Sequence, residues 1–139
     1  MKCRFCEIVK GNADRALISQ SKHCISFLSN PYLMRGHSLV IPKKHYESLI
    51  EMPSPVLHDL IDEIKKLEKR ILKFSDGVTI VQNFLPFVAE KDTKVDHVHF
   101  HLWPRTNFDN YYKKVLIHQK KVWKKVEIKK LNEIKKELF

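Results

Sequence analysis

The sequence lacks any long hydrophobic run, since no stretch approaches the roughly 18 consecutive apolar residues that a membrane-spanning helix needs. The opening residues, MKCRFCEIVKG, contain no apolar core of the roughly 7–15 residues typical of a secretory signal peptide. Cysteine is scarce, with three in the chain. We therefore expect a cytoplasmic protein without membrane spans. In it, Cys3, Cys6 and Cys24 are expected to be free or to bind a metal rather than to form disulfides, with Cys24 in the core.

The sequence also contains no internal repeat and no low-complexity linker that would divide it into domains. Its 139 residues, 43% hydrophobic and 30% charged, are ordinary for one globular domain. We predict a single domain over residues 1–139, in which residues 106–139 are a basic C-terminal extension that ends in a helix.

Positive charge is unevenly distributed along the chain. The formal net charge is +10, and the segment from Lys113 to Phe139 holds ten lysines against three glutamates. Such a field could attract nucleic acid or another polyanion. A lysine-rich helix with one solvated face explains the same composition and is the more common case. A nucleic-acid partner therefore stays open as an alternative.

Hydrophobic periodicity predicts an antiparallel sheet with two helices. Apolar runs bounded by turn residues predict strands at 24–29, 36–42 and 78–84. Apolar residues at helical spacing predict a long helix over 55–74, with Ser54 as its N-cap. A strand is expected in the histidine-rich run that follows, antiparallel to its predecessor, and an amphipathic helix near the C-terminus. This pattern indicates an α+β fold with one long central helix.

The run DHVHFHLWPR at 96–105 places His97, His99 and His101 at every second position. In an extended strand these three imidazoles point to one face, and the apolar residues between them point into a core. Three explanations are open for such a row. It can be a polar sheet face, a metal centre to which H-x-H offers two ligands, or a site of nucleophilic catalysis by imidazole.

The same residues resemble the histidine-triad family. HVHFHLW fits the pattern His-φ-His-φ-His-φ-φ, in which φ is apolar, and PR follows as in many members. Further landmarks occur in the family's order: CRFCEIVKG at the N-terminus, ISFLSNPYLMRGHSLVIPKKH at 25–45, a helix, and then Asn83. The resemblance covers roughly residues 1–105. The long tail is similar to the fragile-histidine-triad branch of dinucleoside polyphosphate hydrolases.

The resemblance implies a catalytic mechanism. His99 matches the nucleophile, which attacks the α-phosphorus of a nucleotide and forms a nucleotidyl-histidine that water then releases. His101 would donate to the phosphate or the bridging oxygen, His37 matches a histidine near that cluster, and Asn83 would reach a phosphate or leaving-group oxygen. The implied substrate is a nucleotide whose α-phosphate bears a second group, such as a dinucleoside polyphosphate. A binding or signalling module with little turnover is the alternative.

The residues expected to bind the substrate depart from the family pattern. Ser29, beside Asn30, stands where the family places an Asp or Asn that binds ribose, and Phe5, Phe27 and Leu28 are candidates for the apolar base pocket. The stretch NFLPFVAEKDTKVDH contains none of the glycines common before the triad, and it places Thr93 and Lys94 at the expected phosphate-binding positions. This change bears on the identity of the substrate more than on the chemistry.

The resemblance also implies a metal site and a dimer. In zinc-containing bacterial members, the equivalents of Cys3, Cys6, His45 and His97 bind one zinc ion. Two thiolates and two imidazoles make the closed tetrahedral shell of a structural zinc site. The cysteine pair by itself also fits a redox pair or reduced, metal-free thiols. Family members form homodimers through the long helix and a strand, and we expect a homodimer here.

Overall fold

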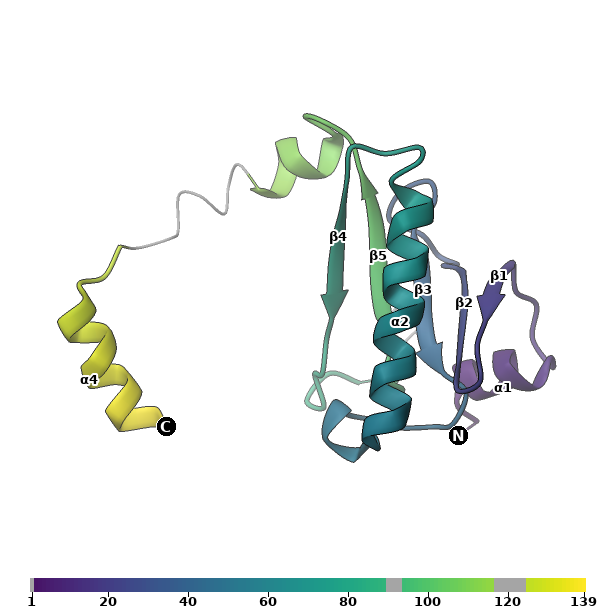
Figure 1. Ribbon diagram of the computed structural model, residues 1–139, viewed down its shortest axis with the longest axis horizontal. Coiled ribbons are helices and arrows are strands. Elements are labelled where there is room, and N and C mark those ends of the chain that lie inside the picture. Colours follow the sequence, from purple (N-terminus) through teal and green to yellow (C-terminus); the bar gives the residue numbers. More distant parts are fainter. Residues whose placement is uncertain (1, 90–93, 117–124) are drawn as a thin grey trace. The chain divides into compact units, whose positions relative to one another are not determined.

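The computed structural model describes residues 2–89, 94–116 and 125–139. The chain divides into two compact units, Met1–Thr106 and Asn107–Phe139. The first unit is built on a five-stranded antiparallel sheet with strand order β1-β2-β3-β5-β4 (Figure 1). The fold is α+β, as predicted. In chain order its elements are α1 (Arg4–Lys10), β1 (Leu17–Gln20), β2 (Cys24–Leu28), β3 (Ser38–Pro42), the 3-10 turn η1 (Leu49–Glu51), α2 (Ser54–Ile71), β4 (Gly77–Gln82) and β5 (Phe100–Arg105).

The sheet buries apolar side chains on both faces. The helix α2 lies along one face of the sheet (Figure 1). Its side chains pack there against Val40 of β3 and Leu102 of β5. Alternate residues of β3, Leu39 and Ile41, point to the other face and pack with Phe5 of α1. Because β3 is covered on both sides, all five of its residues are buried, which explains its continuous apolar run.

The long helix α2 confirms the predicted helix, with different ends. Its buried apolar residues recur at helical spacing, whereas Ser54, the predicted N-cap, is the first helical residue and Pro53 holds the cap position. Pro53 is extended, and a proline early in a helix lacks only an N–H that would have no partner there. The helix ends at Ile71 rather than at Phe74, because the Lys73 and Phe74 amides bond to carbonyls three residues back, which tightens the last turn.

The histidine strand is shorter than predicted. β5 begins at Phe100, so His97 and His99 precede it, and it pairs with β3 through Val40↔Phe100, Leu39↔His101 and Ser38↔Leu102. Pro42 at the end of β3 has no N–H to continue that ladder. The Val98 amide instead donates to the Tyr46 carbonyl at 2.7 Å. Alternation still holds across the boundary, since Val98 and Leu102 are buried under α2.

Two N-terminal elements were not predicted, α1 and β1. The signal for α1 is present: Phe5 and Ile8 are its buried residues, and Gly11 ends it in the left-handed region at φ 80°. β1 has only four residues, and its pairing with β2 contains a register shift between Leu17 and Ser19. A short strand with a bulge has too little alternation to be recognised in a sequence.

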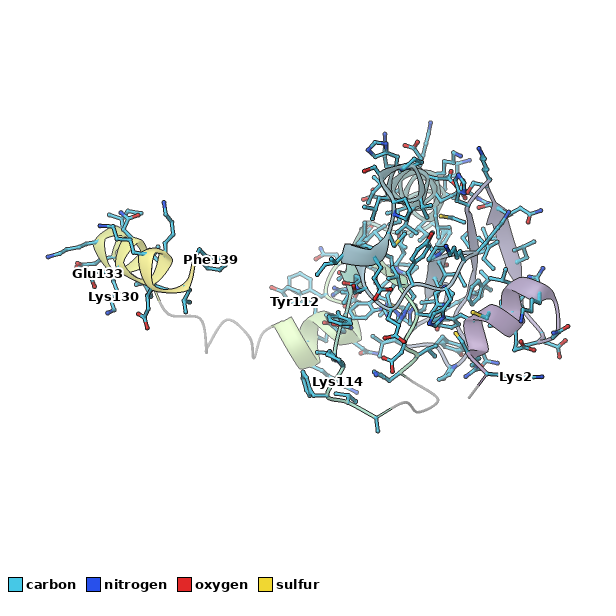
Figure 2. All side chains as sticks on the ribbon, turned by 90° about the horizontal axis from the view of Figure 1, so that it is seen from below. Lys2, Tyr112, Lys114, Lys130, Glu133 and Phe139 are labelled. Carbon is cyan, nitrogen blue, oxygen red and sulfur yellow. The ribbon has the colours of Figure 1, made fainter. Side chains whose placement is uncertain are left out.

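The second unit contains the predicted C-terminal helix, α4 (Ile128–Leu138), and a π-helical turn, η2 (Tyr112–Leu116). Within α4, Lys130 lies 3.5 Å from Glu133 in an exposed pair; both are labelled in Figure 2. Its apolar side chains Ile128, Leu131 and Leu138 are exposed. Across the described residues we find no helix of the length and apolar character needed to cross a membrane.

Candidate active site and metal centre

A pocket of about 880 Å³ opens on the sheet face that carries α1. His99 and His101 line it together with His37, which precedes β3. The three residues predicted for the base pocket, Phe5, Phe27 and Leu28, also line it. A smaller pocket of about 170 Å³ also adjoins His99 and His101. The two catalytic candidates on the histidine row therefore border both cavities.

His99 is held in one orientation. Its Nδ1 lies 2.6 Å from the His97 carbonyl oxygen, and the edge of the Phe5 ring packs against it with the ring centroids 5.2 Å apart. A carbonyl only accepts, so Nδ1 carries the proton and Nε2 carries the lone pair. Burial lowers the pKa of His99 below its usual value, and the hydrogen bond to the His97 carbonyl opposes this only in part. The side chain is therefore a neutral imidazole with a nucleophilic Nε2 at pH 7.

His101 and His37 form a pair beside His99. His37 Nε2 lies 2.8 Å from His101 Nδ1, and the backbone amide of Leu33 donates to His37 Nδ1 at 3.0 Å. The indole Nε1 of Trp103 lies 3.1 Å from His37 Nε2. Burial lowers the pKa of both histidines to about 4, so both are neutral at pH 7.

The predicted phosphate-binding residues lie on the side of the smaller pocket. Asn83, directly after β4, lines both cavities. Lys94 lines the smaller cavity and is paired with Asp96. Thr93 lies outside the described residues. A lysine and an amide at this position can supply hydrogen-bond donors to phosphate oxygens.

The predicted ribose residues, Ser29 and Asn30, line the large pocket. Ser29 donates its hydroxyl to the Pro31 carbonyl at 2.7 Å, which leaves its oxygen as an acceptor. Arg4, from α1, donates to the Asn30 carbonyl at 3.0 Å and lines the same pocket. Ser29 can therefore accept one hydrogen bond from a sugar hydroxyl, where a carboxylate could accept two.

The four predicted metal ligands meet at one point. One potential ligand atom from each of Cys3, Cys6, His45 and His97 lies within 4.8 Å of the others. His97 Nδ1 is 3.4 Å from Cys3 Sγ and 3.7 Å from Cys6 Sγ, and His45 Nδ1 is 3.6 Å from Cys6 Sγ. Three elements or loops separated by more than 30 residues supply these side chains, so their convergence is a product of the fold.

The chemistry of this donor set, two thiols and two imidazoles, fits a metal ion. His97 places Nε2 2.9 Å from the Pro42 carbonyl, so Nε2 carries the proton and the Nδ1 lone pair faces the cysteines. Burial lowers the pKa of His97 to about 4, which keeps it in the neutral form that binds metal. Burial and the adjacent Cys3 raise the pKa of Cys6 to about 11, and a bound cation reverses this effect by stabilising the thiolate.

Two features of the site were not predicted. Trp103 continues the alternation two residues after His101 and lines the large pocket, so its spacing was an available signal. The Leu33 amide belongs to the irregular segment between β2 and β3, and nothing in a sequence indicates where a backbone N–H in such a segment points.

Comparisons with known proteins agree with this geometry. A family model for the HIT domain matches residues 10–108. An uncharacterised HIT-like protein of Methanocaldococcus jannaschii is 37% identical over 108 residues, which are 77% of this chain and 81% of that protein. An adenosine 5′-monophosphoramidase of Schizosaccharomyces pombe is 33% identical over 107 residues, 77% of each chain. The solved structure of a HIT family member from Bacillus subtilis shares the fold, with a TM-score of 0.79 and 24% identity over 99% of this chain and 95% of that one.

Proposed function

The chain belongs to the HIT family and is an enzyme that acts on nucleotides, and we propose that it cleaves them at the α-phosphate through a covalent intermediate on His99. The reaction is hydrolysis, or nucleotidyl transfer where phosphate replaces water as the acceptor. The observation that carries this proposal is the hydrogen bond from His99 Nδ1 to the His97 carbonyl. Because the ring is neutral, this bond leaves the lone pair of Nε2 for the substrate. The His99 side chain borders both cavities.

The proposed reaction has two displacements at phosphorus. His99 Nε2 forms a bond to the α-phosphorus while the bond to the leaving group breaks, and the leaving group departs with the electron pair. Water then attacks the same phosphorus, and the phosphorus–nitrogen bond breaks with its electron pair returning to His99 Nε2. The proton that water loses passes to solvent, and a nucleoside monophosphate is released with His99 restored. His101 donates a hydrogen bond to the oxygens that gain charge, and Asn83 and Lys94 are placed to do the same.

The substrate class follows from the large pocket. Phe5 and Phe27 supply an apolar wall for a base, and Ser29 and Asn30 supply polar groups at the sugar. A dinucleoside polyphosphate and an adenosine phosphoramidate both present an α-phosphate that bears a second group. The relative from Schizosaccharomyces pombe is named for the second of these activities, and the resemblance of the tail favours the first.

A structural zinc ion and a homodimer complete the proposal. The ligand set Cys3, Cys6, His45 and His97 would bind zinc, which stabilises the fold around α1 when bound. The strand β4 lies at one edge of the sheet, and Ile61 of α2 is 48% exposed, so an edge and an apolar helix surface are available for a second copy. We also retain the cytoplasm as the expected location.

Trapping the intermediate tests the proposed function. The pure protein is incubated with adenosine 5′-phosphoramidate, diadenosine triphosphate and diadenosine tetraphosphate, quenched in acid, and analysed by mass spectrometry. We expect AMP as product and an adenylyl group on the peptide that contains His99. His99→Ala should lower turnover by about three orders of magnitude or more while nucleotide binding remains.

The control for that experiment is His58→Ala, which removes an exposed histidine on α2 and should leave turnover unchanged. Normal turnover in His99→Ala, or a labelled peptide that does not contain His99, would remove the covalent mechanism.

A further inference from the structure

Three hydrogen-bonding groups converge on the two ring nitrogens of His37. The Leu33 amide donates to Nδ1 at 3.0 Å. His101 Nδ1 lies 2.8 Å from Nε2, and the Trp103 indole Nε1 lies 3.1 Å from the same Nε2. A neutral imidazole has one acceptor nitrogen and one donor nitrogen. Two N–H groups from outside therefore cannot both be accepted by one neutral ring, and one of these contacts must determine the tautomer.

The Leu33 amide is the less adaptable of the two donors, because it is fixed in the backbone, whereas the Trp103 indole N–H, which also can only donate, belongs to a half-buried side chain that lines the large pocket. A backbone N–H can only donate, so it requires a lone pair on His37 Nδ1. The proton of the neutral ring then lies on Nε2, from which it is donated to His101 Nδ1. His101 in turn carries its own proton on Nε2, the nitrogen that remains for substrate. In this arrangement the Trp103 indole N–H has to turn from His37 Nε2 to another acceptor, which a half-buried side chain at the pocket can do. Its ring packs against His37 at a centroid distance of 6.0 Å and an interplanar angle of 89°.

Each tautomer leaves one outside N–H facing a ring N–H, and the conflict is harder to relieve at the backbone amide of Leu33 than at the Trp103 side chain. If His37 Nε2 accepted the Trp103 indole N–H, the proton on Nδ1 would face the Leu33 N–H across 3.0 Å. His37 is 6% exposed, so little solvent is available to relieve two N–H groups directed at each other. Burial also favours the neutral ring over the cation.

The loop that carries this amide is anchored at both ends. The Ser29 amide donates to the His37 carbonyl at 2.8 Å, and the His37 amide donates to the Met34 carbonyl at 3.0 Å. Gly36, at φ 84°, lets the chain turn into β3, and a side chain there would lie 3.1 Å from Pro104. The Leu33 side chain is 54% exposed, so the amide rather than the side chain is the group aimed at the site.

We propose that the backbone amide of Leu33 is a positioning group that sets the tautomer of His37, and through it that of His101, so that His101 presents an N–H to the substrate phosphate. The last clause rests on the proposed function. The tautomers themselves do not, because they can be measured without substrate.

The first test is the tautomeric state of the wild-type protein. Long-range proton–nitrogen NMR spectra of the full-length chain labelled with 15N-histidine, at pH 7, report which ring nitrogen is protonated, and His37→Gln and His101→Gln assign the signals. We expect both rings to carry the proton on Nε2. A proton on Nδ1 of either ring would overturn the proposal. This measurement requires no variant to be active.

The second test removes the amide hydrogen. Leu33→Pro, or replacement of Leu33 by its α-hydroxy analogue to give a backbone ester, deletes the N–H, whereas Leu33→Ala retains it as the matched control. We expect loss of the single tautomer at His37 and a fall in kcat of roughly tenfold with little change in KM. Leu33→Ala should retain the single tautomer at His37, and Trp103→Phe should leave both tautomers unchanged.

The outcomes separate the two proposals. If the tautomers are as expected and respond to the amide but no substrate is turned over, the proposed function fails and the positioning role stands. If the ester retains a single Nε2–H tautomer at His37, the positioning role is overturned whatever the activity. Should Leu33→Pro fail to fold, the wild-type spectrum and the ester still decide the question.

Discussion

The two ends of the histidine row use the imidazole side chain in different hydrogen-bonding states. The metal end is His97 with Cys3, Cys6 and His45, and the phosphate end is His101 with His37. At the metal end, His97 donates Nε2–H to the Pro42 carbonyl, and its Nδ1 lone pair faces the cysteines. His99 reverses this assignment, because its Nδ1 meets the His97 carbonyl and Nε2 is left for substrate. His101 at the phosphate end pairs through Nδ1 with His37. The role of each ring therefore follows from the hydrogen-bond partner that it meets, rather than from its residue type.

The two ends are coupled through His97 and Phe5. His97 belongs to the metal cluster through its side chain and orients His99 through its carbonyl. Phe5, between Cys3 and Cys6 in the sequence, packs against His99. A substitution at the metal end should therefore also disturb the orientation of His99, whereas a substitution at the phosphate end should leave the metal bound. The predictions that follow test this asymmetry.

Substitution of His101 at the phosphate end should have the largest of these effects on kcat. His101→Ala deletes the proposed donor to the charge that develops on phosphate oxygens, and we expect kcat to fall by roughly 10²–10³-fold. Metal content should remain at about one ion per chain, measured by elemental analysis of protein purified without chelator. A parallel loss of metal would contradict the asymmetry.

Substitution of a metal ligand should lower kcat by a smaller factor and should clearly lower the stability of the fold. Cys6→Ser deletes one ligand, so we expect metal content to fall towards zero, Tm to drop, and kcat to fall by about 10–100-fold as His97 and His99 lose their orientation. Cys24→Ala is the matched control, because Cys24 lies in the core under α2 and should not affect metal content. A wild-type protein that is fully folded and metal-free would rule out the zinc site.

Acid should destabilise the phosphate end. His37 and His101 have a pKa of about 4 in the folded chain, against the ordinary 6.5. Between these values the unfolded chain binds more protons than the folded chain, so the free energy of unfolding falls as the pH falls from 6.5 towards 4. Each histidine contributes at most about 1.4 kcal/mol per pH unit.

Urea unfolding at pH 7, 6 and 5 measures the slope of the free energy of unfolding against pH. The Cys6→Ser background removes metal release as a contribution to it. In that background, His101→Gln should reduce the slope by the contribution that one histidine makes to it. An unchanged slope would mean that His101 is not held neutral by the fold.

The C-terminal unit should contribute least to catalysis. Exchange of four exposed lysines of α4 for glutamine, in the full-length chain, should leave kcat and KM within about twofold if this helix only presents a solvated face. Binding to duplex DNA, measured at several salt concentrations, tests the alternative. A salt-dependent affinity that the exchange abolishes would indicate a nucleic-acid role for the tail; the exchanged residues are Lys129, Lys130, Lys135 and Lys136.

Much of the site could be predicted because it repeats a simple spacing. The alternation around His97 and His99 survives even though both lie outside β5, since an extended backbone alternates its side chains with or without a paired neighbour. The strand end could not be predicted, because it depends on Pro42 in another strand. The helix α1 has only seven residues, and a helix of that length is stabilised by its packing rather than by its own sequence pattern.

Residue order alone determined the α+β class, the family, the shared face of the three histidines and the candidate ligands around Cys3 and Cys6. These properties are carried by residue identity and by periodicity, which belong to short stretches of chain. Tertiary structure decided which nitrogen of His97 and of His101 bears its proton, because the groups that they meet, the Pro42 carbonyl and the His37 ring, come from distant segments. A backbone group has the same chemistry at nearly every position, so only folding can select the one that a ring meets.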